Sequence, residues 1–265
     1  MSSLSRYLRL ALALFRYSLA REMMFKANFL LWILVEIAWL SLQLALVGVI
    51  FSHVTEVAGW TKYEMVLLIG TSHLVQQLFQ VVFLINLIEL PENVRTGKLD
   101  FALLQPASPQ FLASVRKYDP GSVVNCAIGV AFVVWAAWKL GLHPAAWQVG
   151  LFLGMVINGV FIHYALMLMI VTLAFWIVRA QGLVYGYYNL FNLTRMPREA
   201  FRGVARLLFT WVLPMLVVAN FPAQVLARGV IGPGAPLIFL LTLLLLAAAR
   251  AWFRFGLRFY TSASS

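Results

Sequence analysis

The chain has 265 residues, of which 63% are hydrophobic and only 11% are charged, whereas soluble domains carry about 25% charged residues. This shortage of charge excludes an ordinary soluble domain, and the sequence contains several apolar runs of the roughly 20 residues that a helix needs to cross a bilayer. The net charge of +11 indicates membrane orientation in such a chain, so we expect no nucleic-acid partner. The predicted fold class is an all-α polytopic membrane protein.

Residues 1–27 are predicted to be an amphipathic helix that lies in the membrane interface. Leu and Phe are interleaved there with Arg at roughly helical spacing, which would turn a basic side toward anionic lipid headgroups. The plain alternative is a frayed basic tail. A membrane domain is expected over residues 28–258, and residues 259–265 form the predicted C-terminal tail.

Six crossings are predicted within the membrane domain, and five of them are placed by hydropathy. They are Phe29–Ile50, Glu64–Leu87, Ser122–Leu140, Trp147 to about Val178, and Pro236–Ala251. The remaining crossing, the fifth along the chain, has two possible positions. It lies either at 204–226, with the preceding arginines in a cytoplasmic loop, or at about 181–195, followed by an outer re-entrant hairpin from Pro197 to Leu226.

Two observations bear on the position of the fifth crossing, and they disagree. Gly182 and Gly186 have the GxxxG spacing that suits close helix packing, which favours the crossing at 181–195. Gly150 and Gly154 repeat this spacing in the fourth crossing. The arginines at 195, 198, 202 and 206 favour the other position, because positive charge collects on the cytoplasmic side.

The remaining positive charges predict the orientation. With the disputed arginines and Arg228 left out, Lys and Arg gather in the N-terminal segment, in the loop between the second and third crossings, at Arg179 and near the C-terminus. Only Lys62 and Lys139 fall on the other side. Both termini and the central loop are therefore expected in the cytoplasm.

The central loop, residues 89–119, is predicted to be structured. Pro91 suits the first turn of a helix, and Gly97 suits a left-handed stop, so the loop is interpreted as short helices held at defined angles. Such a helix would carry four charged side chains that can dock in a groove of a cytosolic partner: Glu92, Arg95, Lys98 and Asp100. The alternative is an ordinary solvated loop that obeys the positive-inside rule.

The segment E-N-V-R-T-G-K-L-D-F-A-L-L-Q-P (Glu92–Pro106) resembles the first cytoplasmic loop of ATP-binding-cassette (ABC) exporter permeases of the second class. The similarity is to the short six-span subgroup whose ATPase is a separate subunit. It continues through "LAFWIVRAQ" (Leu173–Gln181), Arg195–Leu226 and the ending "FGLRFYTSASS" (Phe255–Ser265). It therefore covers most of the chain in order.

The resemblance implies a half-transporter in the bacterial cytoplasmic (inner) membrane. Two permease chains, identical or paralogous, would form one pathway above two cytosolic ABC ATPase subunits. The coupling helix gripped by the ATPase would be Glu92–Leu104, with Arg95, Gly97 and Asp100 at matching positions. Pro197–Pro222 resembles the outer re-entrant segment of the family.

This chain is expected to be a transport subunit and not an enzyme. Its only Gly-Lys pair, Gly97-Lys98, lacks the upstream glycine of a phosphate loop. ATP and Mg²⁺ are therefore expected on the partner ATPase, and no cofactor is expected in this chain. A lipid-modifying enzyme is not favoured, because the four histidines are scattered over different elements.

Several polar residues in the predicted spans are candidates for a substrate pathway. Glu36 is an acid in the middle of an apolar run, flanked by Trp32 and Trp39, and it would either face a cationic substrate or bond a neighbouring helix in its neutral form. The other candidates share helix faces: His73, Gln76, Gln77 and Gln80 on one, and Tyr185, Tyr187, Tyr188 and Asn189 near another. Packing contacts and interfacial anchoring are the alternatives. A lone His among glutamines predicts no metal site.

The favoured function is therefore the membrane subunit of an ATP-driven exporter of a small hydrophobic or cationic compound. The alternative is a secondary transporter driven by an ion gradient. Such transporters commonly contain internal repeats and midplane ion sites, and no convincing repeat is found here.

Overall fold

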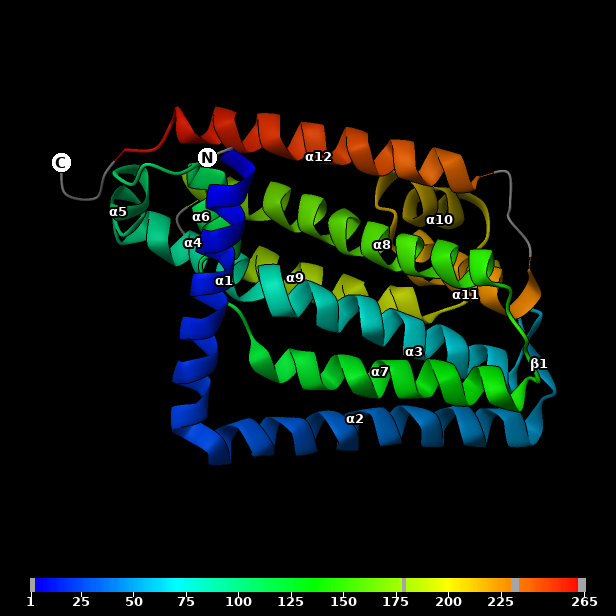
Figure 1. The fold of residues 1–265 in the computed structure, drawn as a ribbon. Coiled ribbons are helices and arrows are strands. Elements are labelled where there is room, and N and C mark those ends of the chain that lie inside the picture. The colour runs from blue at the N-terminus through cyan, green and yellow to red at the C-terminus, as the bar shows by residue number, and fades with distance from the viewer. Residues whose placement is uncertain (1–2, 178–179, 230–233, 262–265) are drawn as a thin grey trace.

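The computed structural model describes residues 3–177, 180–229 and 234–261, so Val178, Arg179 and the end of the predicted tail lie outside the described residues. The predicted all-α fold is confirmed, because the only strands in these ranges are the two of one short β-hairpin (Figure 1). Five helical segments are long and apolar enough to cross a membrane. The chain is thus a polytopic membrane protein.

The long helices run side by side (Figure 1). In chain order they are α2 (Lys26–His53), α3 (Lys62–Phe79) continued by the π-helical turn η2 (Gln80–Leu84) and α4 (Ile85–Arg95), α7 (Pro120–Lys139), α8 (Ala146–Thr172) continued by η3 (Leu173–Phe175), and α12 (Ala235–Leu257). The short helices α5 (Leu99–Leu103) and α6 (Pro109–Val115) lie with α4 at one end of the bundle, called here the elbow end. The strands β1 (Glu56–Val57) and β2 (Trp60–Thr61) lie at the opposite end, called the β1–β2 end.

A short helical segment runs along the bundle where the fifth crossing is predicted. It consists of α9 (Gln181–Phe191) and the 3₁₀ turn η4 (Asn192–Arg195). Tyr188 bonds Gln80 of the α3–η2 helix, whereas Thr194 bonds Ser72, which lies closer to the β1–β2 end. Helix α9 and the turn η4 together span about 24 Å. The residues after them continue to Trp60 of β2. This segment therefore traverses the bundle, as in the second of the two predicted positions.

The segment after it enters the bundle and returns to the same end. Helix α10 (Gly203–Leu207) with its π-helical turn η6 (Leu208–Val212) meets α11 (Met215–Arg228) at a bend of 84°. Before this pair, Glu199 of the turn η5 (Arg198–Ala200) accepts a bond from Trp60 at 2.9 Å; after it, Arg228 donates to Glu64 at 3.0 Å. Both ends of the pair thus lie at the β1–β2 end.

The middle of this pair reaches the interior of the bundle. A Cβ placed on Gly159 of α8 would meet the side chains of Val218 and Val75. The straight crossing at 204–226 is therefore wrong. Pro214 lacks an N–H, and Leu213 beside it leaves the helical region at φ −115° and ψ 77°, so an apolar run of sufficient length folds as a re-entrant hairpin.

The second crossing is longer than predicted. Pro91 does not begin a new helix but lies inside α4. One continuous helix runs from Lys62 to Arg95. Leu87 and Leu90 are fully buried just before the proline, and this packing holds the helix together despite the missing N–H. At 1.5 Å per residue the helix is about 51 Å long, so its last turns extend beyond an apolar core of about 30 Å unless it is strongly tilted.

The prediction of one continuous coupling helix over Glu92–Leu104 is also wrong. Gly97 adopts φ +72° and divides the segment into the end of α4 and the separate helix α5. The predicted left-handed stop at Gly97 is confirmed by this φ value. A residue with a side chain would be strained in this conformation, which is why glycine suits the position.

The N-terminal helix α1 (Ser3–Glu22), followed by the turn η1 (Met23–Phe25), lies across the elbow end, roughly perpendicular to α2 (Figure 1). It is attached by Ser18, whose hydroxyl accepts a bond from the backbone N–H of Tyr118 at 3.0 Å. The ring of Phe15 also meets that of Tyr118 edge-on at 5.5 Å. Burial at this contact raises the pKa of the Tyr118 phenol.

The predicted GxxxG contacts are not made within the part of the chain that the structure describes. A Cβ added at Gly150, Gly154, Gly182 or Gly186 would meet nothing within 4 Å. The close approach of α3 and α7 instead uses Gly129, where a Cβ would lie 3.2 Å from the backbone of Leu74. The spacing of glycines identifies a smooth helix face, but it does not identify the helix that the face meets.

We expect Gly129→Val to destabilise the bundle by about 1–3 kcal/mol, because the added atoms would press on the backbone of α3. Thermal unfolding in detergent, followed by circular dichroism, measures this change. Gly154→Val adds the same atoms where nothing lies within 4 Å, so its effect should stay within about 0.5 kcal/mol. Equal destabilisation by both variants would contradict the packing described here.

Candidate functional site

The elbow, residues 89–119, is attached to the end of the second crossing by a buried side chain. Asn86 of α4 donates to the carbonyl of Lys117 at 2.8 Å and accepts from the N–H of Lys117 at 2.8 Å. Asn86 is only 5% exposed, so breaking this pair would leave buried polar groups unsatisfied. The Lys117 ammonium also pairs with Glu89 at 2.5 Å. The chain leaving the elbow is thus held against the helix that enters it.

A second contact attaches the elbow to the fourth crossing. The Tyr164 hydroxyl of α8 accepts from Gln110 at 3.0 Å and lies 2.9 Å from the Ser114 hydroxyl, and both partners belong to α6. Ser114 is buried. Movement of α6 therefore acts directly on α8.

The π-helical turn η2 provides the third attachment. Its widened backbone presents the carbonyl of Val81 to the N–H of Asp119 at 3.0 Å. The carboxylate of Asp119 then caps α7, accepting from Gly121 N at 3.0 Å and from the Ser122 hydroxyl at 2.8 Å. Pro120 at the first helical position suits this start. The second and third crossings are therefore joined at the point where the elbow ends.

The outer face of the elbow carries exposed apolar side chains beside an ion pair. Phe101 of α5 and Leu104, which directly follows this helix, are 68% and 84% exposed. Glu92 and Arg95 form a two-pronged pair at 2.9 and 2.7 Å on the last turn of α4. A cleft of about 600 Å³ lies between these elements, and its lining includes Glu92, Lys98, Phe101 and Arg116.

Among the predicted coupling residues, Asp100 contacts the C-terminal segment of the chain. It interacts with Tyr260, which follows α12, and burial together with the Asp100 carboxylate raises the pKa of the Tyr260 phenol to about 12. The elbow is thereby connected to the C-terminal segment.

A polar cluster lies between α2, α3 and α9. Its first part is centred on Glu36, whose side chain is 25% exposed. Gln77 donates to the Glu36 carboxylate at 3.2 Å, and His73 Nδ1 lies 3.4 Å from the same oxygen. The opposite ring nitrogen of His73 lies 3.2 Å from the carbonyl of Asn125 in α7.

The second part of the cluster is centred on Arg195, at the end of η4. Its guanidinium donates to Gln76 at 2.6 Å, and Gln76 in turn donates to the Tyr188 hydroxyl at 3.0 Å. Gln80 donates to the same hydroxyl at 3.0 Å. Arg195 and Glu36 also interact electrostatically, so the two parts form one cluster with one charge of each sign.

The cluster retains hydrogen-bonding capacity. Gln77 Oε1, Asn125 Oδ1 and Arg195 Nε are buried and have no hydrogen-bond partner within the described ranges. A buried polar atom without a partner costs about 1–3 kcal/mol. These three atoms therefore have hydrogen-bonding capacity that the described contacts leave unused.

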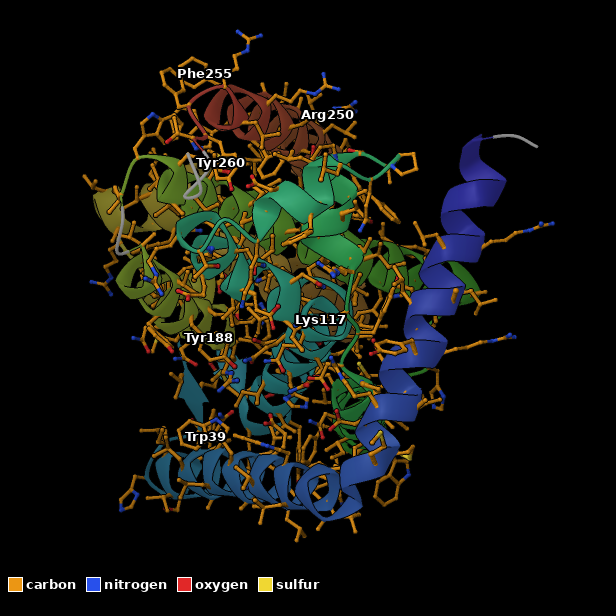
Figure 2. The ribbon with its side chains drawn as sticks, turned by 90° about the vertical axis from the view of Figure 1, so that its left-hand side faces the viewer. Trp39, Lys117, Tyr188, Arg250, Phe255 and Tyr260 are labelled. Atoms are coloured by element: carbon orange, nitrogen blue, oxygen red, sulfur yellow. The ribbon has the colours of Figure 1, made fainter. Side chains whose placement is uncertain are left out.

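Five of the seven predicted pathway residues belong to this cluster: Glu36, His73, Gln76, Gln80 and Tyr188. Tyr185 and Asn189 do not join it, and lie on the exposed face of α9. In Figure 2, Trp39 lies between α2 and the helices above it, below Tyr188.

Sequence reasoning missed Arg195 and Gln43 as members of the cluster. When the oxygen of the Gln43 amide faces these two residues, it accepts hydrogen bonds from Trp39 Nε1, at 2.7 Å, and from the Arg195 guanidinium. Gln43 lies seven residues after Glu36 on the same helix face, which is a usable signal. No local pattern indicated Arg195, because it reaches the cluster from a short 3₁₀ turn distant in sequence.

A comparison with protein families gives the chain its identity. The family model described as ABC-2 family transporter protein matches residues 37–264. The chain belongs to the ABC-2 family of transporter proteins. No curated protein and no solved structure matches it. Family membership makes the chain a membrane permease subunit of an ABC transporter and implies a partner ATPase.

The family match covers the elbow and nearly all of the polar cluster, since Glu36 is the one cluster residue described above that falls outside it. Within the described part of this ABC-2 chain, no group of three or more His, Cys, Asp or Glu side chains is placed to hold a metal ion. The candidate site of the permease is therefore the braced elbow together with the polar cluster.

We expect Arg195→Met to lower the free energy of unfolding by about 2–3 kcal/mol, since it leaves Gln76 without its donor and Glu36 without its opposite charge. The single cysteine, Cys126, is half-buried, so its reaction with a thiol-reactive dye during heating reports unfolding. Arg202→Met removes the same charge from an exposed position and should have little effect. An equal loss in both variants would contradict the role of the cluster.

Proposed function

We propose that this chain is half of a dimeric ABC exporter and that a separate cytosolic ATPase drives it through the elbow. The observation that carries the proposal is the exposed apolar pair Phe101 and Leu104 on a segment that is otherwise firmly attached. Exposed apolar side chains of this kind mark protein-binding surfaces. Glu92, Arg95, Lys98 and Asp100 would supply the surrounding charges, and Gly97 the turn between α4 and α5.

The elbow is suited to transmit force. A push on α5 or α6 reaches the second crossing through Asn86, the third through Asp119 and the fourth through Tyr164. The ATPase would shift the balance between two conformations of these helices by binding one of them more tightly. ATP and Mg²⁺ belong to that partner in this proposal.

The elbow end is proposed to face the cytoplasm of a bacterial cell, with both termini on that side of the inner membrane. Arg95, Lys98 and Arg116 lie at this end, in accord with the positive-inside rule. At the β1–β2 end part of the positive charge is balanced, since Arg228 pairs with Glu64 and Arg198 lies 3.7 Å from Glu199. Helix α1 would lie in the interface, with its basic residues against anionic lipid.

A second permease chain, identical or paralogous, is proposed to pack beside α2. Only 11% of the most apolar window of this helix is buried within the chain. Glu36 lies on α2 and keeps part of its side chain exposed. A partner chain there would enclose Glu36 between two subunits and place it on a shared pathway.

The proposed substrate is a small hydrophobic or cationic compound. Glu36 supplies a negative charge, and Trp39, Tyr185 and Tyr188 supply aromatic faces, a combination that suits an organic cation. His73, Gln76, Gln80 and Asn189 would contribute polar contacts along the route. Export is the direction expected from the resemblance to exporter permeases.

We expect Arg95→Glu and Leu104→Asp each to reduce stimulation of the partner ATPase at least tenfold, because they alter the docking surface and not the spans. ATPase activity and co-purification from native membranes measure this effect. Arg254→Glu reverses an exposed charge on the last turns of α12, near the same end of the molecule, and serves as the matched control. Failure to recover any ATPase under gentle detergent conditions would contradict the proposal.

We expect Glu36→Gln to reduce ATP-driven uptake of tetraphenylphosphonium into inverted vesicles about tenfold, while uptake of a neutral hydrophobic dye changes less than twofold. The reason is that only the cation uses the carboxylate, and one decade corresponds to about 1.4 kcal/mol. Glu56→Gln, at an exposed position of β1, is the control. Equal loss for both dyes would assign Glu36 to stability, and uptake with an ion gradient but no ATP would favour a secondary transporter.

A further inference from the structure

The β1–β2 end contains arginines whose charges are not all balanced. Arg228 pairs with Glu64 at 3.0 Å, and Arg198 lies 3.7 Å from Glu199. Arg206, on α10, takes part in no ion pair within the described part of the chain. An unbalanced cation on a membrane-embedded hairpin is costly and is by default a candidate for binding.

Arg206 lies in a pocket with Arg198. The pocket has a volume of about 260 Å³, and its lining consists of Arg198, Gly203, Arg206, Leu207, Thr210 and Trp211. These residues come from the turn η5, from α10 and from the π-helical turn η6. The guanidinium of Arg198 is already held in place, because it stacks over the Phe221 ring at 5.0 Å.

Thr210 gives this pocket an unused donor. It is 3% exposed, and its hydroxyl has no hydrogen-bond partner within the described ranges. Three other buried threonines in helices, Thr71, Thr172 and Thr242, each donate to the carbonyl four residues earlier, at 2.7, 2.6 and 2.9 Å. Thr210 makes no such bond and lies in a π-helical turn, a conformation frequent at functional sites.

Arg198 retains a free donor as well. Its Nε is buried and unpartnered. The nearby carboxylate of Glu199 is already occupied, since its two oxygens accept from Trp60 at 2.9 Å and from Gln224 at 3.2 Å. The pocket thus combines two cations, one neighbouring anion and a free hydroxyl, and is complementary to a ligand with a single negative charge.

The surroundings of the pocket are apolar. Leu207 and Trp211 line it and are also exposed, and Val204 and Val212 on the same segment are exposed. A ligand that binds here therefore meets donors on one side and apolar surface on the other. Arg and hydroxyl donors suit phosphate oxygens, and the apolar surface suits acyl chains.

We propose that Arg198, Arg206 and Thr210 bind the phosphate of an anionic phospholipid whose chains lie against Leu207 and Trp211. The ligand chemistry is that of a phosphodiester with one negative charge. This site is separate from the elbow and the polar cluster, and the proposal does not depend on the identity of a transported compound.

The test measures binding of phosphatidylglycerol to the purified full chain in a neutral detergent by native mass spectrometry. Diacylglycerol with the same chains is the uncharged probe, and we expect it to bind at least tenfold more weakly. Arg206→Gln should weaken phosphatidylglycerol binding about tenfold, and Thr210→Val about threefold to tenfold. Arg202→Gln removes the same charge from an exposed residue outside the pocket lining and should change binding less than twofold.

Three results would overturn the proposal. Equal weakening by Arg202→Gln and Arg206→Gln would reduce the effect to general surface charge. Equal binding of diacylglycerol would assign it to the chains alone. Displacement of the lipid by inorganic phosphate at the same concentration would make the site one for free phosphate. Unchanged melting temperatures ensure that the variants are compared in the folded state, and Thr210→Val tests the pocket with all charges retained.

Discussion

The pair of hydrogen bonds between Asn86 and the backbone of Lys117 is the constraint on which the elbow depends. It joins two segments 31 residues apart in a buried setting, where a lost partner costs more than the bond itself contributes. Without it, the elbow would keep its bonds to Tyr164 and Val81 but would lose the bond that holds the chain leaving it against the end of the second crossing. With it, the elbow and three crossings form one mechanical unit.

The elbow and the polar cluster share one helix. The α3–η2–α4 segment carries Gln76 and Gln80 in its middle and Asn86 closer to the elbow, with the π-helical turn between them. This widened turn supplies a carbonyl to Asp119. A rotation of the segment driven at the elbow would therefore alter the contacts that the glutamines make with α9.

Much of this architecture could be predicted from the sequence, because hydropathy and charge are local properties. Glu36 and the glutamine face were identified in this way. The start of a helix at Pro91 was predicted wrongly because the burial of Leu87 and Leu90, which depends on distant helices, outweighs a local preference. Arg195 could not be assigned, since its position follows from the path of α9 and η4 through the bundle.

The re-entrant hairpin has a consequence for biogenesis. Residues 204–226 are apolar enough to enter a translocon as a complete span, and nothing in their own hydropathy prevents insertion across the bilayer. Their return to the starting side rests on Pro214 and on contact with α3 and α8, which leave the ribosome earlier. The final orientation of α12 therefore depends on the side-chain packing of the hairpin. An error in that packing would place the carboxyl terminus on the opposite side of the membrane.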